Sequence, residues 1–375
     1  MIYLDSAATT MEKPLSVGRA VLTAMRSSAS PGRGGHPASR RAGEIIYGFR
    51  KTAAEMFDVP NFEQVVLTCN ATHGLNIAIK SLVEPGSVVL ISGYEHNAVT
   101  RVLHSIPGVE IRVAHGKLFD QEACYQAFEQ AMTPEVDAVI CTHVSNVFGF
   151  ILPIEAIAEL CREKRVPLVV DASQSAGILP ISMKKLGVAF IAMPGHKGLY
   201  GPQGTGILLC GAEPKPLLFG GTGSESLNQG MPVFLPDALE AGTQNVCGAA
   251  GLRSGLEFVM QTGPDRILNH ECDLSETLRE RIRSVPGIRI FEGQHQSGLF
   301  SFLFERIDCE VVGERLGELG VAVRSGLHCA PLAHQTAGTL ERGTIRVSFS
   351  VFNRRKELEY VVNSLRKIGK GQGTY

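Results

Sequence analysis

One lysine stands inside a stretch rich in glycine and proline, with an apolar run on either side. Residues 194–206 read PGHKGLYGPQGTG, and Lys197 is the only lysine or arginine between positions 187 and 211. A lysine in a poorly solvated setting has a lowered pKa, so its amine is available as a nucleophile. The glycines would leave clearance around the backbone. The pattern indicates a reactive lysine, with an ordinary surface lysine as the alternative.

Polar side chains follow five apolar segments that read as buried strands. They are Thr72 and His73, then His96, then Asn146, then Asp171 with Gln174, and last His196 with Lys197. The carboxyl ends of parallel strands meet at one edge of an open sheet, so these side chains are expected to converge there. A solvated face would instead mix glutamate, lysine and serine. The sequence therefore predicts a ligand site at this edge.

The first of these strand ends is suited to an anion. Residues 70–74 carry Thr72 and His73 just before a predicted helix. Backbone N–H groups at a helix N-terminus, together with a hydroxyl, favour a phosphate. The alternative is that Thr72 is an ordinary helix cap.

A lysine, an aspartate, a phosphate site and a flat aromatic ring together match the needs of pyridoxal phosphate. Lys197 would form the Schiff base, and Asp171 would face the pyridinium nitrogen and keep it protonated. His96 would stack on the ring, and Asn146 or Gln174 would hydrogen-bond the phenolic oxygen. A nucleotide-binding P-loop is excluded, because neither GKS nor GKT occurs.

A second glycine-edged stretch, RSGLHCAPLAHQTAG at 324–338, contains Cys329 beside His328. Loops of this kind often bear catalytic groups, and thiolate reactivity depends on local positive charge and partial exposure. Spacing alone leaves open whether Cys329 is a nucleophile or a packing residue. Arg346 is an unexpected charge inside the strand-like TIRVSFS. It fits a substrate carboxylate, with a structural ion pair as the alternative.

The spacing of apolar segments predicts two domains. Expected strands cover 64–69, 87–92, 137–144, 166–173, 188–193 and 206–210, and a helix covers 153–164. This alternation predicts a mainly parallel sheet covered by helices. After about residue 250 the pattern is a smaller α+β unit, with helices over 251–262, 269–285, 310–319 and 354–368. We expect a large pyridoxal phosphate-binding domain over 15–255 and a small domain made of 1–14 and 256–375.

The composition limits partners and compartment. Lys and Arg number 36 against 37 Asp and Glu among 375 residues, with no basic run, so neither nucleic acid nor membrane is expected as a partner. The apolar runs are strand-sized, and the N-terminus shows no secretory signal. Nine scattered cysteines without a CxxC pair predict no metal site and reduced thiols in a cytoplasmic protein.

Nine motifs spread over nearly the whole chain carry a resemblance to a known family. They are YLDSAATT, TCNATHGLN, YEHNAV, HVSNVFG, VDASQS, GHKGLYGPQGTG, EAGTQN, RSGLHCA and IRVSFSVFN. They resemble the cysteine desulfurases of the class V aminotransferase superfamily, in the branch of SufS-type desulfurases and selenocysteine lyase-like proteins. The resemblance implies the fold-type I α/β architecture: a large domain with a mainly parallel seven-stranded sheet flanked by helices, plus a smaller α+β domain.

The resemblance also implies a role for each matching residue. Around the cofactor, Lys197 would carry the Schiff base and transfer protons, His96 would stack on the ring, and Asp171 would pair with the pyridine nitrogen. Gln174 would contact the phenolic oxygen, and Thr72 and His196 would hold the phosphate. On the substrate side, Asn146 would lie near the substrate, Arg346 and Arg324 would bind it, and Cys329 would attack its sulfur. Thr243, in EAGTQN, would reach the phosphate of the neighbouring subunit. This implies a homodimer with shared active sites.

The implied reaction converts L-cysteine into L-alanine and leaves a persulfide on Cys329. Three alternatives stay open: a selenocysteine lyase acting on L-selenocysteine with the same residues, a class V aminotransferase that does not use Cys329, and a pyridoxal phosphate-binding protein with a regulatory role. The sequence does not identify a sulfur-acceptor protein.

Two stretches differ from the family pattern or have two interpretations. Pro194 stands where the family usually has serine before GHK, and we expect His73 to supply the missing phosphate contact. The segment SPGRGGHPAS at 30–39 contains Arg33 and His36. These two residues would line the neighbouring active site, or the segment is a simple glycine turn.

Overall fold

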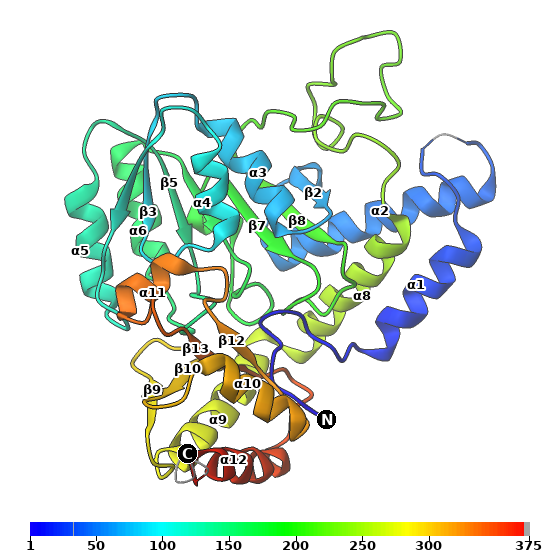
Figure 1. Cartoon of the computed structure of the whole chain (residues 1–375). Coiled ribbons are helices and arrows are strands. Elements are labelled where there is room, and N and C mark those ends of the chain that lie inside the picture. The colour runs from blue at the N-terminus through cyan, green and yellow to red at the C-terminus, as the bar shows by residue number, and fades with distance from the viewer. Residues whose placement is uncertain (33, 371–375) are drawn as a thin grey trace.

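The structure is a computed structural model that describes residues 1–32 and 34–370 (Figure 1). Within those residues the strands form one sheet of seven strands, one of four and one of two. Helices pack around the seven-stranded sheet, and the four-stranded sheet lies beside it with helices of its own. The predicted α/β class with a mainly parallel seven-stranded sheet is confirmed.

The large sheet has a single antiparallel strand. In spatial order it contains β2 (Val65–Thr68), β8 (Gly206–Cys210), β7 (Phe190–Pro194), β6 (Leu168–Asp171), β5 (Val136–Thr142), β3 (Val88–Ser92) and β4 (Glu110–Ala114). Strand β8 runs antiparallel to both of its neighbours, and the other pairs are parallel. Six of the seven strands are those predicted. The sequence missed β4, because its edge position leaves Glu110 and Arg112 in contact with solvent and breaks the apolar run.

The central strands are continuous apolar runs because both faces of the sheet are covered. Strands β6 and β7 are buried at every position. Successive side chains point to opposite faces, so in β3 Leu90 packs into one core while Val89 and Ile91 pack into the other. The sheet therefore separates two apolar layers.

The helices of the large sheet are divided between these layers. Their bounds are α1 (Leu15–Ser27), α2 (Pro37–Met56), α3 (Ala71–Leu82), α4 (Asn97–His104), α5 (Gln121–Ala131), α6 (Ile154–Lys164), α7 (Met183–Leu186) and α8 (Val246–Thr262), and a 3-10 turn η1 covers Phe62–Gln64. Helices α3 and α4 cover one face, and α2, α5, α6 and α8 contribute to the core on the other. The carboxyl ends of the strands are left for loops.

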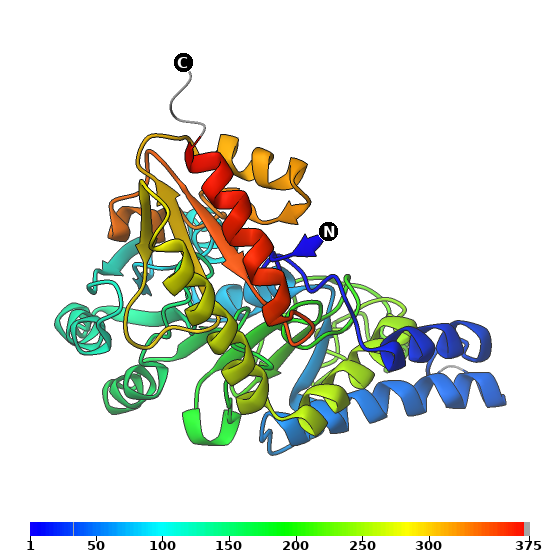
Figure 2. The same cartoon turned by 90° about the horizontal axis from the view of Figure 1, so that it is seen from below.

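The small unit is built on an antiparallel sheet in the order β12 (Arg324–Gly326), β13 (Thr344–Ser348), β10 (Leu299–Phe304) and β9 (Ile288–Phe291). Its helices are α9 (Pro264–Ile282), α10 (Cys309–Glu318) and α12 (Arg355–Lys370), whereas α11 (Pro331–Ala337) packs on the core of the large sheet. Figure 2 shows α9 and α12 side by side across this sheet. The residues after Cys329, predicted as a loop, form α11, which starts at a proline suited to a first helical turn.

The N-terminus belongs spatially to the small unit. Strand β1 (Ile2–Tyr3) pairs in parallel with β11 (Val321–Ala322). The predicted boundary near residue 255 falls inside α8, which therefore connects the two units as one continuous helix. On this basis we propose a large domain over 15–255 and a small domain made of 1–14 and 256–375.

In the described part of the chain, no helix combines the length and apolar character needed to cross a membrane.

A buried ion pair fixes the edge strand β2, whose carboxyl end leads to the predicted phosphate site. Arg50 on α2 pairs with Glu240, and its Nε donates to the Val65 carbonyl at 3.2 Å. Glu240 Oε1 also accepts from the Leu67 N–H at 2.8 Å. Both charged side chains are almost fully buried. Removing one partner would leave the other charge buried without compensation.

Replacing Arg50 by Met should therefore lower the free energy of unfolding by about 3–5 kcal/mol. Urea denaturation of wild type and variant measures the change. The matched control is Glu359→Gln, which breaks an exposed pair with Arg281 and should cost less than about 1 kcal/mol. Equal costs for the two variants would contradict a structural role for the Arg50–Glu240 pair.

Candidate active site

A cavity with about 110 Å³ of space for the centres of water molecules lies at the carboxyl ends of the central strands. Its walls include most of the residues selected from the sequence: Thr72, His96, Asn146, Asp171, Gln174, His196 and Lys197, with Asn70, Ser173 and Pro194 between them. The convergence expected from the parallel sheet is thus present.

Lys197 is held by tight backbone packing around the loop that follows β7. A side chain at Gly198 would come within 2.4 Å of the Ala176 carbonyl oxygen, so the chain can pass here only with glycine. Thr10 donates a hydrogen bond to the Lys197 carbonyl at 2.5 Å. Burial, and then the charge of Arg346, lowers the pKa of Lys197 to about 8, although Asp171 opposes the shift. A usable fraction of neutral amine results near neutral pH.

Asp171 and His96 form the middle of the cavity. Asp171 ends β6, is almost fully buried, and accepts from the Ser173 N–H at 2.9 Å. No lysine, arginine or histidine of the described chain pairs with it within 4.0 Å. His96 caps α4 by accepting the Ala98 N–H at 3.0 Å, and burial lowers its pKa to about 4, so its ring is neutral. A buried carboxylate without a cationic partner beside a neutral ring fits a pyridinium group.

The phosphate end of the cavity is formed by the start of α3. Asn70 is the helix cap and accepts the His73 N–H at 2.8 Å, so the alternative that Thr72 is the cap is wrong. The N–H groups of Ala71 and Thr72 have no acceptor within the helix. His196 lines the same cavity, and its Nδ1 lies 3.0 Å from Thr9 Oγ1. Free N–H groups and an adjacent hydroxyl fit a phosphate, and the cavity as a whole fits pyridoxal phosphate.

Arg346, on β13 of the small unit, is 2% exposed and lies next to the cavity without lining it. Its Nη2 donates to Asp5 Oδ1 at 2.7 Å and its Nη1 to the Asn146 carbonyl at 3.0 Å. The predicted alternative of an ion pair is therefore present, yet Nε is buried without a partner. Arg324 stands directly opposite Arg346 on β12. Two adjacent guanidinium groups, one with an unused donor, are suited to a carboxylate ligand.

Cys329 is exposed at the tip of a loop that is fixed to the same site. His328 and Cys329 both adopt left-handed backbone angles, with φ of 50° and 56°. The Asn97 N–H donates to the Cys329 carbonyl at 2.7 Å, and Asn146 Nδ2 donates to the His328 carbonyl at 2.8 Å. Such strained backbone is retained where the surroundings determine it. The loop is thus anchored to residues beside the cavity.

Some predicted residues are not brought into this cavity. His73 does not line it, and its Nδ1 instead lies 3.4 Å from Cys69 Sγ. Thr243 is exposed and also outside the lining. His36 caps α2 by accepting from Ser39 N at 3.3 Å, as in the turn alternative. Arg33 lies outside the described residues.

The sequence did not identify the roles of the N-terminal segment. Asp5 pairs with Arg346, the Ala7 carbonyl accepts from Gln174 Nε2 at 3.0 Å, and Lys13 Nζ donates to the His196 carbonyl at 2.8 Å. The motif YLDSAATT supported the resemblance to the family, but its residue pattern does not indicate which residues it contacts.

Comparison with known proteins agrees with this geometry. Residues 2–361 match the family described as Aminotransferase class-V. The chain belongs to the class V aminotransferase family. Pyridoxal phosphate is the cofactor of such enzymes, so the predicted family, fold type and cofactor are confirmed.

The similar proteins of this family include desulfurases. A protein of Xylella fastidiosa named probable cysteine desulfurase is 33% identical over 385 residues, which cover 99% of this chain and 91% of that protein. The apo structure of a cysteine desulfurase from Thermococcus onnurineus has a TM-score of 0.89 at 28% identity, covering 99% and 95% of the two chains. A probable cysteine desulfurase of Mycolicibacterium paratuberculosis is 30% identical, and the chain spans 56% of its length. The predicted resemblance to cysteine desulfurases is confirmed.

Lys197 is expected to be the residue that binds the cofactor covalently. Borohydride reduction of the holoenzyme should fix pyridoxal phosphate to the peptide that contains Lys197, as measured by mass spectrometry, and Lys197→Ala should abolish this labelling. Lys13 is the matched control, because burial lowers its pKa to about 8 as well. Labelling at Lys13, or labelling that survives in Lys197→Ala, would contradict the assignment.

Proposed function

We propose that this protein is a pyridoxal phosphate-dependent cysteine desulfurase, which converts L-cysteine into L-alanine and carries the sulfur as a persulfide on Cys329. The observation that supports it best is the anchored cysteine loop: the carbonyls of His328 and Cys329 are bound by Asn146 and Asn97, next to the Lys197 cavity. An aminotransferase that does not use Cys329 gives no reason for this arrangement. The names of similar proteins support the same activity.

The residues of the cavity would hold the cofactor as follows. The start of α3, with Thr72, and His196 would bind the phosphate, Asp171 would accept from the pyridinium nitrogen, His96 would cover the ring, and Gln174 would face the phenolic oxygen. Bound pyridoxal phosphate would supply an electron sink for the bonds at the substrate Cα. Asp171 favours that chemistry by keeping a positive charge on the ring.

Substrate binding and proton transfer use other residues. The free Nε donor of Arg346, with Arg324 beside it, would bind the substrate carboxylate. Asn146 lies between this arginine and the cysteine loop, because its carbonyl accepts from Arg346 while its amide donates to His328. The neutral amine of Lys197 would take the proton from Cα and return it.

Cys329 would take the sulfur atom. Its thiolate forms a bond to the substrate sulfur while the bond from that sulfur to Cβ breaks. The electron pair of the broken bond stays on carbon, which gains a proton and becomes the methyl group of alanine. The thiol proton of the substrate balances this gain, so no external oxidant or reductant is needed.

Replacing Cys329 by Ala should leave the cofactor absorbance intact and lower sulfide release from L-cysteine, in the presence of excess dithiothreitol, by about 10³-fold or more. The matched control is Cys69→Ala, because Cys69 is the other exposed cysteine, and it should retain full activity. Unchanged sulfide release by Cys329→Ala would contradict the proposal. Release of selenide from L-selenocysteine by both variants, with none from L-cysteine, would assign a selenocysteine lyase instead.

The proposal includes a homodimer with shared active sites. The loop between β8 and α8 projects from the molecule (Figure 1). It exposes Phe219, Leu227 and Val233 by at least 77%, and it leads directly to the exposed Thr243. Large apolar side chains in this number mark an interaction surface. A cytoplasmic location is also proposed, since all nine cysteines are free.

Wild type should sediment as a dimer, and Phe219→Asp should shift the protein toward monomer. Because Thr243 would contact the partner's phosphate, the same variant should lose pyridoxal phosphate more readily on dialysis. Val311→Asp on α10 places the same charge on another exposed apolar side chain and should change neither property. A fully active wild-type monomer would contradict the shared site.

A further inference from the structure

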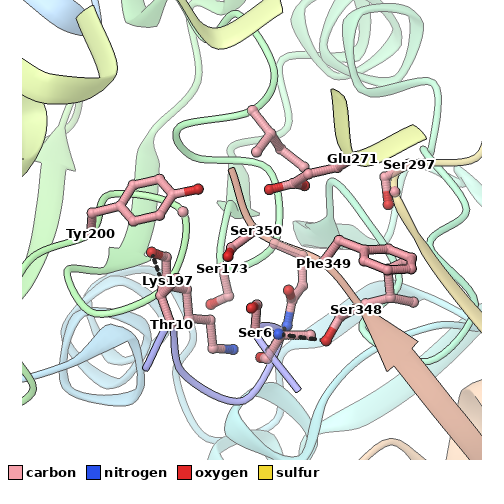
Figure 3. A pocket seen from close by; sticks show the side chains of 16 residues that line it. Ser6, Thr10, Ser173, Lys197, Tyr200, Glu271, Ser297, Ser348, Phe349 and Ser350 are labelled. Carbon is pink, nitrogen blue, oxygen red and sulfur yellow. Dashed lines mark hydrogen bonds between the residues drawn. The ribbon is translucent and has the colours of Figure 1, made fainter. Parts of the chain in front are cut away.

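A second cavity, shown in Figure 3, has about 40 Å³ of space for the centres of water molecules and adjoins the first. Lys197, Ser173 and Gln174 line both cavities. The remaining walls come from the N-terminal segment, from loops of the large unit that include Tyr200, from α9, and from β10, β13 and the residues beside them. The chemistry assigned to the first cavity makes no use of this space.

The second cavity contains a buried carboxyl group. Glu271 projects into it from α9, is 7% exposed, and has no hydrogen-bond or ion-pair partner among the described residues. Helix α9 packs closely against Gly298 at this point, because a Cβ there would come within 2.3 Å of the Glu271 Cβ. The only other titratable groups that line the cavity in the described chain are Lys197 and Tyr200. The Tyr200 hydroxyl accepts from the Val351 N–H at 3.2 Å.

Several hydroxyl groups of the same cavity lack partners. Ser6 Oγ is buried with no hydrogen-bond partner, and the Ser173 and Ser297 side chains form no hydrogen bond with described residues. A polar space of this volume, with hydroxyl and carboxyl groups on several walls, is suited to ordered water molecules that make two to four hydrogen bonds each. Water would thus connect the Glu271 carboxyl to the wall that contains Lys197.

We propose that Glu271, through water held in this cavity, exchanges protons with the Lys197 amine during turnover. Glu271 touches neither substrate nor cofactor in this arrangement and acts through Lys197. The inference rests on the proposed function, which requires that amine to transfer protons.

Protons leave and join several different atoms during the reaction, so a second proton-exchanging group near the Lys197 amine would be useful. Cα of the substrate loses one proton and regains one, Cβ gains one when the carbon–sulfur bond breaks, and the substrate thiol loses one. These losses and gains cancel overall but fall on different atoms, so an amine that also exchanges protons with a neighbouring group can serve them in any order. Transfer from the Glu271 carboxyl through water to the neutral amine leaves a carboxylate and an ammonium, and the reverse step restores both.

Glu271 and Lys197 have similar proton affinities, which suits such an exchange. Burial raises the pKa of Glu271 to about 8. Burial and Arg346 lower the pKa of Lys197 to about 8. Because neither group is a much stronger acid than the other, a proton can move in both directions at little cost in free energy.

The test is the exchange of the Cα hydrogen of L-alanine for deuterium in D2O, followed by NMR with the holoenzyme. This exchange requires Lys197 but not Cys329, so it remains measurable even if desulfuration fails. Glu271→Gln should slow it by about 10- to 100-fold and change its pH profile, without loss of cofactor absorbance. Glu271→Asp should restore part of the rate. An unchanged rate and pH profile in Glu271→Gln would overturn the proposal.

A second variant and a second readout guard against a folding defect. Ser6→Val fills part of the cavity without changing any charge, so it should also slow exchange, and an unchanged rate would count against the water route.

Thermal unfolding supplies the independent readout. Because the pKa of Glu271 is raised on folding, wild type should lose stability relative to Glu271→Gln as pH rises from about 5 to about 9. A difference in melting temperature that does not vary with pH would show that Glu271 is already ionised and would overturn the proposal.

Discussion

The site depends on keeping the amine of Lys197 poorly solvated while leaving it in reach of a ligand. Burial alone would disfavour its charged form, and the positive charge of Arg346 adds to the effect. Asp171 limits the shift, so the pKa settles at about 8 rather than lower. The close approach of Gly198 to the Ala176 carbonyl fixes the loop that carries the lysine. Charge, burial and backbone clearance thus act on one amino group.

The proposed site draws on both units, although the large unit alone lines the first cavity. The large sheet contributes Asp171 and Lys197, whereas the small unit contributes Arg346 and Cys329. The first residues of the chain join them, since Asp5 pairs with Arg346 and Thr10 bonds to the Lys197 carbonyl. A change in the relative position of the units would therefore disturb the guanidinium and the cysteine loop together. Helix α8 runs without interruption between the units and limits such a change.

The two cavities around Lys197 differ in chemistry. One presents free helix N–H groups, a buried carboxylate and a neutral imidazole, which suit a phosphorylated pyridine ring. The other presents Glu271 and serine hydroxyls, which suit water. Lys197 lines both cavities, so it would have pyridoxal phosphate on one side and a proton-exchanging carboxyl group on the other. The raised pKa of Glu271 means that this carboxyl does not place a fixed negative charge beside the amine near neutral pH.

The sequence by itself determined the class of fold, six of the seven strands of the large sheet, and the residues at their carboxyl ends, because buried parallel strands are continuous apolar runs that end at one edge. It also determined the family, through GHK and HCA. The tertiary structure decided the contacts that join distant segments: Asp5 with Arg346, and Asn97 with the Cys329 carbonyl. It placed Glu271 in a cavity that Lys197 also lines, although an isolated glutamate in a helical sequence is typical of a surface residue. Local patterns record burial and periodicity, whereas pairing across hundreds of residues depends on how the two units pack.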